Sequence, residues 1–152
     1  MTRGAPYAEL QCASHFSFLR GASSPDELFS CAAKLGYPAL GIADLGSVAG
    51  VVRAWEAEKA TGVRLIAGTR IDLSCGRRLL LYPTDKRAWS RITRLLTIGK
   101  RRAGKGACLV HWHELEAWSE GVIAILLPHE ADAENAAALG NLKSVYGRRA
   151  HM

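Results

Sequence analysis

The sequence predicts an α/β fold in which parallel strands are joined by crossover helices. Short apolar runs alternate with amphipathic segments that are long enough to connect neighbouring parallel strands. The 152 residues are 49% hydrophobic and 22% charged, a composition typical of a globular domain with a sizeable core. This pattern does not distinguish a barrel from an open sheet.

The chain opens with a predicted strand and a clearly delimited helix. Residues 7–12 alternate loosely between apolar and polar side chains and indicate a short strand. Ser24, Pro25 and Glu27 then give a helix-start signal, with a cap, a proline at the first helical position and a capping box. We expect the helix to end at Gly36. Its predicted inward side chains are Leu28, Phe29, Ala32 and Leu35.

A second strand, helix and strand follow. Residues 39–43 form an apolar run that ends at Asp44 and predicts a buried strand. We expect Ser47 to cap a helix that ends at Gly62, and residues 63–67 to form the next strand. The predicted inward side chains of this helix are Val48, Val51, Val52 and Trp55.

The second half continues the alternation. Residues 71–73 and 79–82 are predicted to pair as a hairpin around residues 74–76. A helix is expected to begin at Thr84 and Asp85, and the polar, glycine-containing residues 99–106 interrupt its pattern. Its predicted inward side chains are Trp89, Ile92, Leu95, Leu96 and Ile98. The remaining predicted elements are a short helix at 113–118, a strand at 122–127 and an alanine-rich helix at 131–145.

Charge and cysteine content narrow the function classes. The formal net charge of +6 favours a polyanionic partner. The four cysteines contain no C-x-x-C pair, which argues against a zinc knuckle and predicts buried or half-buried thiols. No signal peptide and no apolar run of about 20 residues is present, so we expect a cytoplasmic protein without a membrane partner. The cysteines are Cys12, Cys31, Cys75 and Cys108.

Five segments together carry a family resemblance. They are residues 7–11 (YAELQ), 16–23 (FSFLRGAS), 47–54 (SVAGVVRA), 79–85 (LLLYPTD) and 94–106 (RLLTIGKRRAGKG). The first three resemble the N-terminal PHP (polymerase and histidinol phosphatase) domain of alpha-subunit-type, or C-family, bacterial DNA polymerases. The last two are similar to the error-prone branch of that family.

The resemblance implies a truncated, incomplete PHP-like domain over residues 1–152, with about half of the β/α units of a barrel. The parent family consists of DNA-directed DNA polymerases, nucleotidyltransferases associated here with damage-tolerant synthesis. Their palm, fingers and later domains would lie beyond Met152. We therefore expect no polymerase active site and no catalytic residue in this chain.

The metal positions implied by the resemblance are mostly occupied by other residue types. Intact PHP domains cluster His, Asp and Glu side chains, which suit divalent metals, at strand ends. Here the first His-x-His pair corresponds to Gln11 and Ala13, and the following Asp-His pair to Asp44 and Leu45. The next glutamate corresponds to Arg70, a cation that would repel a metal. We expect no metal or other cofactor, and a structural Asp44 that bonds to Arg70 or to a helix terminus.

A second set of possible ligands surrounds residues 111–113 (HWH). Glu114, Glu116 and His129 are close in sequence, yet no recognisable motif positions a third ligand. We expect surface histidines next to a packing tryptophan, and a loop position for His15.

A basic stretch follows the predicted hairpin. Residues 86–105 contain eight cations, and only Asp85 opposes them. Four are expected in a glycine-containing turn that could follow a phosphate backbone: Lys100, Arg101, Arg102 and Lys105. The alternative is a solvated helix face plus a loop that docks on an acidic neighbouring domain.

Three functional hypotheses remain open. The first is a non-catalytic PHP scaffold of an error-prone DNA polymerase, whose partners are the other polymerase domains. The second is a free-standing, metal-dependent phosphoesterase of the PHP type. The third is a non-catalytic module that binds DNA or repair proteins.

Overall fold

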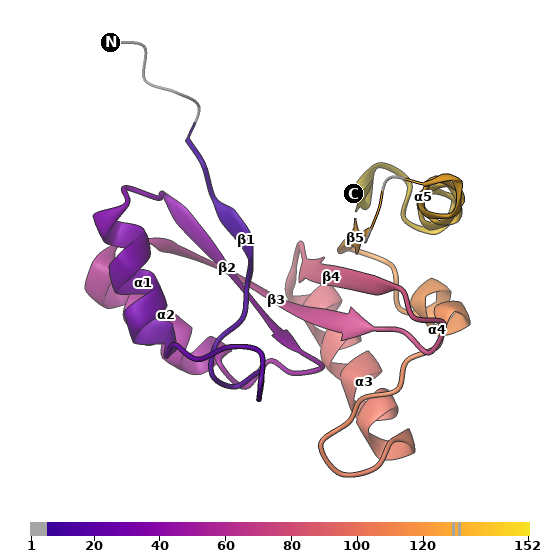
Figure 1. Cartoon of the computed structure of the whole chain (residues 1–152), viewed down its shortest axis with the longest axis horizontal. Coiled ribbons are helices and arrows are strands. Elements are labelled where there is room, and N and C mark those ends of the chain that lie inside the picture. Colours follow the sequence, from indigo (N-terminus) through magenta and orange to yellow (C-terminus); the bar gives the residue numbers. More distant parts are fainter. Residues whose placement is uncertain (1–5, 129, 131) are drawn as a thin grey trace. The chain divides into compact units, whose positions relative to one another are not determined.

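The computed structural model describes residues 6–128, 130 and 132–152. The chain forms two compact units, one up to Gly68 and one from Thr69 onward. Strand β3 (Arg64–Asp72) contributes to both units. Hydrogen-bonded strands follow each other in chain order, β1-β2-β3 in the first unit and β3-β4-β5-β6 in the second (Figure 1).

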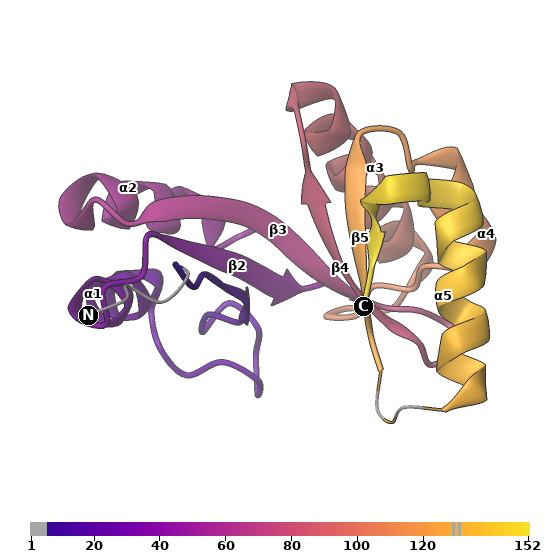
Figure 2. The same ribbon diagram turned by 90° about the horizontal axis from the view of Figure 1, so that it is seen from above.

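The first unit consists of strands packed against a pair of helices. Strands β1 (Glu9–Cys12) and β2 (Ala39–Leu45) are parallel, as predicted. Helices α1 (Pro25–Lys34) and α2 (Val51–Thr61) lie side by side against the strands (Figure 2). One buried cluster joins these elements: Phe29, Ala32, Leu40, Ile42, Ala54, Ala57 and Val63.

Helix α1 begins at its predicted position. The Ser24 hydroxyl accepts a hydrogen bond from the Glu27 amide at 3.3 Å, and the Glu27 carboxylate accepts one from the Ser24 amide at 2.7 Å. This reciprocal pair is the predicted capping box. Phe29 and Ala32 are buried as expected. The inward prediction for Leu35 is wrong, because the helix ends at Lys34 and Leu35 is 61% exposed.

Helix α2 corrects two predictions. It begins at Val51 after a Gly50 cap without a side-chain hydrogen bond, whereas Ser47 accepts from the Ala49 amide ahead of the helix. Its buried face consists of Ala54 and Ala57. The predicted inward residues Val52 and Trp55 are exposed, and the Lys59 ammonium lies 3.2 Å from the Trp55 ring centroid. Small side chains on the packed face allow a close approach to the core, and the hydrophobic pattern does not reveal this.

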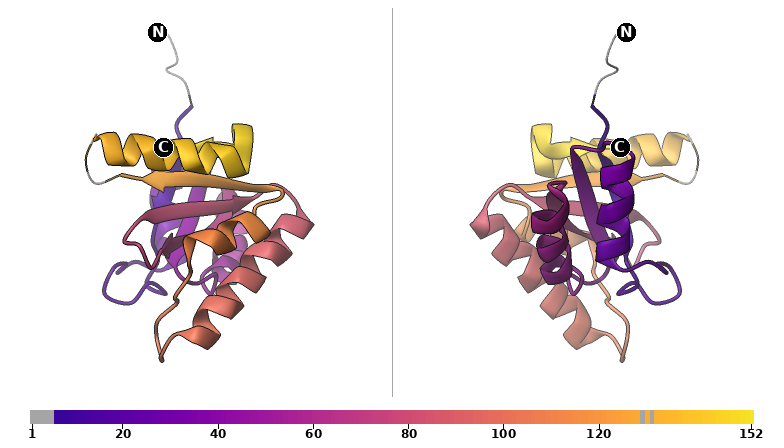
Figure 3. Two further views of the ribbon diagram at one scale, coloured as in Figure 1. Left: turned by 90° about the vertical axis from the view of Figure 1, so that its right-hand side faces the viewer. Right: turned by 90° about the vertical axis from the view of Figure 1, so that its left-hand side faces the viewer.

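The second unit has a mixed sheet. Its elements are β4 (Arg78–Pro83), α3 (Lys86–Arg102), α4 (Trp112–Ala117), β5 (Val122–Leu127), α5 (Ala133–Tyr146), a 3-10 turn (Gly147–Arg149) and β6 (Ala150–His151). Strand β4 is antiparallel to both β3 and β5, and β5 is parallel to β6. Helix α3 packs on β4 and β5, and α5 runs along β5 and β6 (Figure 3).

The predicted hairpin of β3 and β4 is confirmed, but the expectation of parallel strands is wrong for β5, which is antiparallel to β4 although α3 connects them. The turn after β3 contains Gly76 at φ 84°, a conformation that glycine adopts without strain. The chain therefore returns directly beside β3 instead of crossing over. The separately predicted strands at 63–67 and 71–73 form a single strand, because the backbone at Gly68 and Thr69 stays extended and buried.

Two further expectations concern the whole chain. None of the described helices is long and apolar enough to cross a membrane. All four cysteines are free thiols, and Cys12 and Cys108 are half-buried as predicted. Cys31 and Cys75 are exposed, which corrects the prediction for those two.

Candidate functional site

Asp44, which the resemblance predicts to be a vestigial metal position, is a buried carboxylate near the end of β2. Its exposed fraction is 1%. Burial of a carboxylate is costly unless hydrogen-bond donors replace water. The loop after β1 supplies such donors, as described next.

Two serines bind the Asp44 carboxylate. The Ser14 amide donates to Oδ1 at 2.8 Å, and the Ser14 hydroxyl lies 2.9 Å from Oδ2. The Ser17 hydroxyl donates to Oδ1 at 2.7 Å and accepts from the Leu45 amide at 3.0 Å. Both serines are buried. Ser14, Ser17 and Asp44, called the Asp44 cluster below, thus join the loop after β1 to the end of β2.

Gly50 provides the space for the Asp44 cluster. A Cβ atom at position 50 would lie 2.6 Å from Asp44 Oδ2 and 2.9 Å from Ser14 Oγ. Gly50 has φ −74°, so the requirement is for space rather than for an unusual backbone conformation. The residue that caps α2 therefore also accommodates the buried carboxylate.

The other implied metal positions offer no ligand set. Gln11 is exposed, and its amide donates to Glu9 Oε1 at 2.6 Å. Ala13 and Leu45 have no ligand atom in their side chains. Within the part of the chain that the structure describes, no three His, Cys, Asp or Glu residues form a group that could hold a metal ion. The residues present at these positions do not fit the metal cluster of an intact PHP site.

Arg70, at the fourth position, has an acidic partner in its own strand. Its Nε atom donates to Asp72 Oδ1 at 2.8 Å, and its Nη2 atom donates to Oδ2 at 3.1 Å. This bidentate pair within β3 was not predicted. Asp44 was predicted to bond to Arg70 or to a helix terminus; the hydrogen bonds that it accepts within its own unit come from Ser14 and Ser17, which were not predicted.

The sequence analysis missed the two serines. Ser14 and Ser17 are 30 and 27 residues from Asp44, so the pairing is not local. A usable signal was nevertheless present, since two hydroxyls three residues apart directly follow Gln11 and Ala13. Serine hydroxyls can donate hydrogen bonds to a nearby carboxylate.

The residues around position 111 form a helix cap. Helix α4 begins here, which confirms the predicted short helix. His111 Nδ1 lies 2.7 Å from Ser74 Oγ, and the His111 ring stacks on His113 with centroids 5.6 Å apart. Glu114 accepts from the His111 amide at 2.8 Å. His113 and Glu116 are exposed, His15 is an exposed loop residue as expected, and His129 lies outside the described residues.

The basic stretch is more ordered than predicted. Lys100, Arg101 and Arg102 belong to the last turns of α3, and Lys105 follows in a turn. Gly99 does not interrupt the helix, because its missing side chain permits close packing. A Cβ atom there would lie 2.8 Å from Cys108 Sγ and 2.9 Å from Val110 Cγ2.

Arg102 is part of a bidentate ion pair. Its guanidinium donates to the two Glu114 carboxylate oxygens at 2.7 and 2.8 Å, and to the Leu109 carbonyl at 3.2 Å. The Arg102 hydrogen bonds lower the pKa of Glu114 to about 2, although burial opposes this shift. The ion pair fixes the connection between α3 and α4.

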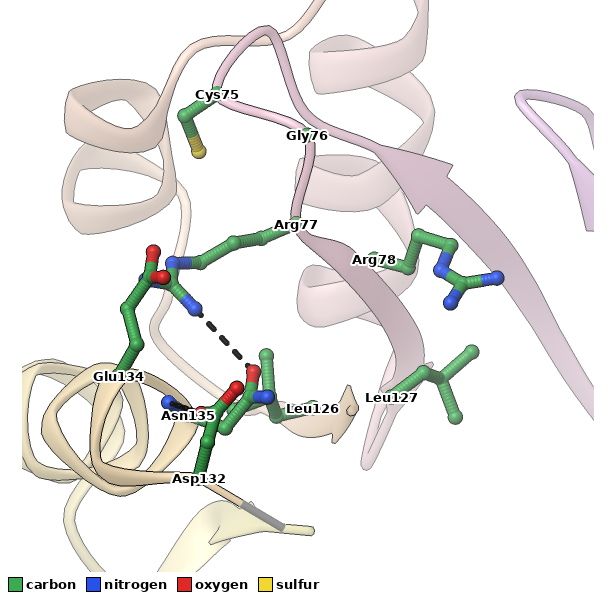
Figure 4. Close-up of a pocket in the computed structure, with 9 residues that line it drawn as sticks. All are labelled: Cys75, Gly76, Arg77, Arg78, Leu126, Leu127, Asp132, Glu134 and Asn135. Carbon is green, nitrogen blue, oxygen red and sulfur yellow. Dashed lines mark hydrogen bonds and ion pairs between the residues drawn. The ribbon is translucent and has the colours of Figure 1, made fainter. Parts of the chain in front are cut away.

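A small pocket lies beside the N-terminus of α5 in the second unit. Its volume is about 200 Å³ (Figure 4). Arg77 points across it, donating to Glu134 at 2.7 Å and to Asn135 at 3.3 Å. Asp132 caps α5 through the Asn135 amide. Because these polar groups bond to each other, the pocket offers no converging set of catalytic groups among the described residues.

Comparisons with known proteins agree with the predicted resemblance. The PHP domain family model matches residues 9–150. Error-prone DNA polymerase 2 of Agrobacterium fabrum is 52% identical over 146 residues, which cover 96% of this chain and 14% of that protein. The error-prone DNA polymerase of Caulobacter vibrioides is 50% identical over 123 residues, 80% of this chain and 11% of that protein. The chain thus spans about a seventh or less of the length of these relatives.

Two solved structures share the fold. An amidohydrolase from Chromobacterium violaceum gives a TM-score of 0.61 at 13% identity over 95% of this chain and 74% of its own. A Bifidobacterium adolescentis protein, proposed to be a metal-dependent phosphoesterase, gives 0.53 at 28% identity over 62% of this chain and 33% of its own. They confirm the predicted α/β fold class and its likeness to part of a PHP-type barrel.

Replacement of Gly50 by alanine should destabilise the protein. The added methyl group forces Asp44 or Ser14 out of its hydrogen bonds, which should lower the free energy of unfolding by about 1–3 kcal/mol. Urea unfolding followed by circular dichroism measures the change.

Gly140→Ala in α5 is the control: no atom lies within 4 Å of its added Cβ, so helix propensity should raise stability by about 0.5–1 kcal/mol. Equal effects of the two substitutions would contradict the assignment.

The Arg102–Glu114 pair should make stability depend on pH in the acid range. The pKa of Glu114 is about 4.3 in the unfolded chain and about 2 in the folded chain. The pair therefore stabilises the fold fully above about pH 4.3, and this stabilisation is lost as the pH falls through 2. Glu114→Gln should cost about 1–3 kcal/mol at pH 7 and little near pH 2 in urea unfolding.

The control for this prediction is Glu116→Gln, which removes an exposed carboxylate from the same helix. This variant should keep the acid-dependent loss of the wild type. A Glu114→Gln variant whose deficit is as large at pH 2 as at pH 7 would show that the charge of Glu114 is not what stabilises the fold.

Proposed function

Because the chain belongs to the PHP domain family, we propose that it is a non-catalytic scaffold of an error-prone DNA polymerase that acts in translesion synthesis during DNA repair. The nucleotidyl transfer itself would belong to other parts of such a polymerase. The scaffold would work in the cytoplasm, where the four cysteines stay reduced.

The Asp44 cluster is the observation that carries this proposal. Metal-dependent hydrolysis needs carboxylate and imidazole ligands with open coordination positions. Asp44 instead accepts hydrogen bonds from Ser14 and Ser17, and the preceding pair reads Gln11 and Ala13. The retained carboxylate thus has a structural role that requires no metal.

A metal-dependent phosphoesterase is the second candidate. The likeness to the Bifidobacterium adolescentis protein favours it, since that protein is proposed to have this activity. The two candidates differ in whether Asp44 binds a metal.

Metal analysis separates the candidates directly. The purified chain, incubated with Mn²⁺ or Zn²⁺ and desalted, should retain no stoichiometric metal and should not hydrolyse p-nitrophenyl phosphate. Elemental analysis and a colorimetric assay provide the two readouts. A stoichiometric metal that is lost in Asp44→Asn, together with hydrolysis, would overturn the scaffold proposal in favour of the phosphoesterase.

A chimeric polymerase tests the scaffold role itself. This chain, replacing the matching segment of the Agrobacterium fabrum error-prone DNA polymerase 2, should support primer extension. Gly50→Ala in the chimera should lower its thermal midpoint and its extension rate on heating together, because it disturbs the Asp44 cluster. Gln11→Ala, at an exposed position, is the control and should leave both unchanged. A fully stable chimera that Gln11→Ala inactivates would show a catalytic role at the old metal position.

A further inference from the structure

Helix α3 carries an unusual charge distribution. Its 17 residues include no Asp or Glu and have these cations: Lys86, Arg87, Arg91, Arg94, Lys100, Arg101 and Arg102. A solvated helix is usually stabilised by oppositely charged pairs three or four residues apart, which α3 lacks. Lys86 and Arg87 also lie in the first turn, where the helix dipole disfavours cations. The helix dipole favours the cations of the last turn, but helix stability does not account for those of the first turn and the middle.

Among the residues that the structure describes, acidic side chains form ion pairs with two of these cations. Arg91 forms an ion pair with Glu120, and Arg102 forms one with Glu114. The side chains of Arg87, Arg94 and Arg101 are exposed and form no hydrogen bond or ion pair with any residue that the structure describes. The unpaired charge of α3 thus lies on its outer face.

Arg87, Arg94 and Arg101 form a straight row along that face. Residues seven apart on an α-helix lie nearly above one another, with a drift of only about 20°. At about 1.5 Å per residue the spacing is about 10 Å, and the row is about 21 Å long. Because α3 is one unbroken helix packed on β4 and β5, the backbone that carries the row is held in place (Figure 3).

We propose that the outer face of α3 binds the phosphate backbone of double-stranded DNA, with Arg87, Arg94 and Arg101 as its contacts. Arginine in a fixed position suits phosphate oxygens, and a duplex presents a regular line of phosphates. Arg102 was expected from the sequence to contact nucleic acid, but its guanidinium donates hydrogen bonds to the Glu114 carboxylate. This inference depends on the charges of α3 and not on the state of the Asp44 cluster.

A duplex fits this face better than a single strand does. Proteins that bind single strands usually stack the bases on exposed aromatic rings. The residues between the arginines along the row are Ser90 and Thr97, and Trp89, the aromatic residue of α3, is half-buried. The row therefore offers cations to a backbone and no platform for bases.

Salt-dependent binding to a fluorescent 20-base-pair duplex tests the proposal by fluorescence anisotropy. Each phosphate contact contributes about −0.9 to the slope of log K against log salt, so Arg87→Ala, Arg94→Ala and Arg101→Ala together should flatten it by about 2.7. From 50 to 200 mM salt, the wild type should then lose about 40-fold more affinity than this triple variant. Circular dichroism verifies that α3 remains folded.

Two further triple variants serve as controls. Lys34→Ala, Arg53→Ala and Arg64→Ala remove the same charge from exposed positions of the first unit, and should leave the slope near that of the wild type. Arg87→Lys, Arg94→Lys and Arg101→Lys should also retain it, because the slope reports charge.

Several outcomes would overturn the proposal. They are an equal flattening in the charge-matched control, a lysine triple that behaves like the alanine triple, and the absence of duplex binding at low salt. Tighter binding of a single-stranded 20-mer would exclude the duplex as the occupant. Equally effective competition by poly-glutamate would indicate an acidic protein surface instead. None of these outcomes alters the metal analysis, so the scaffold proposal is tested separately.

Discussion

The hydrogen bonds that hold the buried Asp44 carboxylate are the constraint on which the first unit depends. A carboxylate that is 1% exposed has lost its water and must be compensated by protein donors. Ser14 and Ser17 provide this compensation from the loop after β1. The same bonds therefore fix the path of that loop and attach it to the end of β2. The Asp44 carboxylate thus acts as the acceptor that joins these two segments.

This constraint also explains how α2 begins. A Ser, Asp or Asn cap would stabilise the helix, yet position 50 is a glycine without a capping side chain. Any Cβ there would lie within 3 Å of both Asp44 and Ser14. Glycine is the cap that leaves space, and it costs only a few tenths of a kcal/mol relative to the best caps. The buried carboxylate thus determines a residue that helix propensity alone would not select.

The sequence was informative where the signals are local. The capping box of α1, the hairpin around Gly76 and the run that forms β5 depend on neighbouring residues, and all three are confirmed. The failures have a common cause in contacts distant in sequence. The packed face of α2 consists of Ala54 and Ala57 and not of the larger side chains that were predicted there. Gly99 lies within α3 because Cys108 and Val110 occupy the space that a side chain at this position would fill.

At the candidate site, too, the sequence predicts some features, while others depend on contacts between residues far apart in the chain. The family resemblance predicts, from the sequence, that metal ligands are missing at Gln11, Ala13 and Leu45. The hydrogen bonds from Ser14 and Ser17 to Asp44 join residues about 30 positions apart, and no periodic pattern reveals such a pairing. Sequence alone could therefore predict a degenerate metal site, but not the serines that bind the Asp44 carboxylate.

The ion pairs around α3 determine which of its positive charges remain unpaired. From the sequence, four cations of the basic stretch were expected on a helix and four on a mobile, glycine-containing turn. In the structure Glu114 binds Arg102 and also caps α4 through the His111 amide, so one buried carboxylate fixes both the end of α3 and the start of α4. With Arg91 also paired, the charge left over is held on the outer face of a rigid helix. A preorganised row loses less conformational entropy on binding than a loop does, so fewer cations suffice for a given affinity.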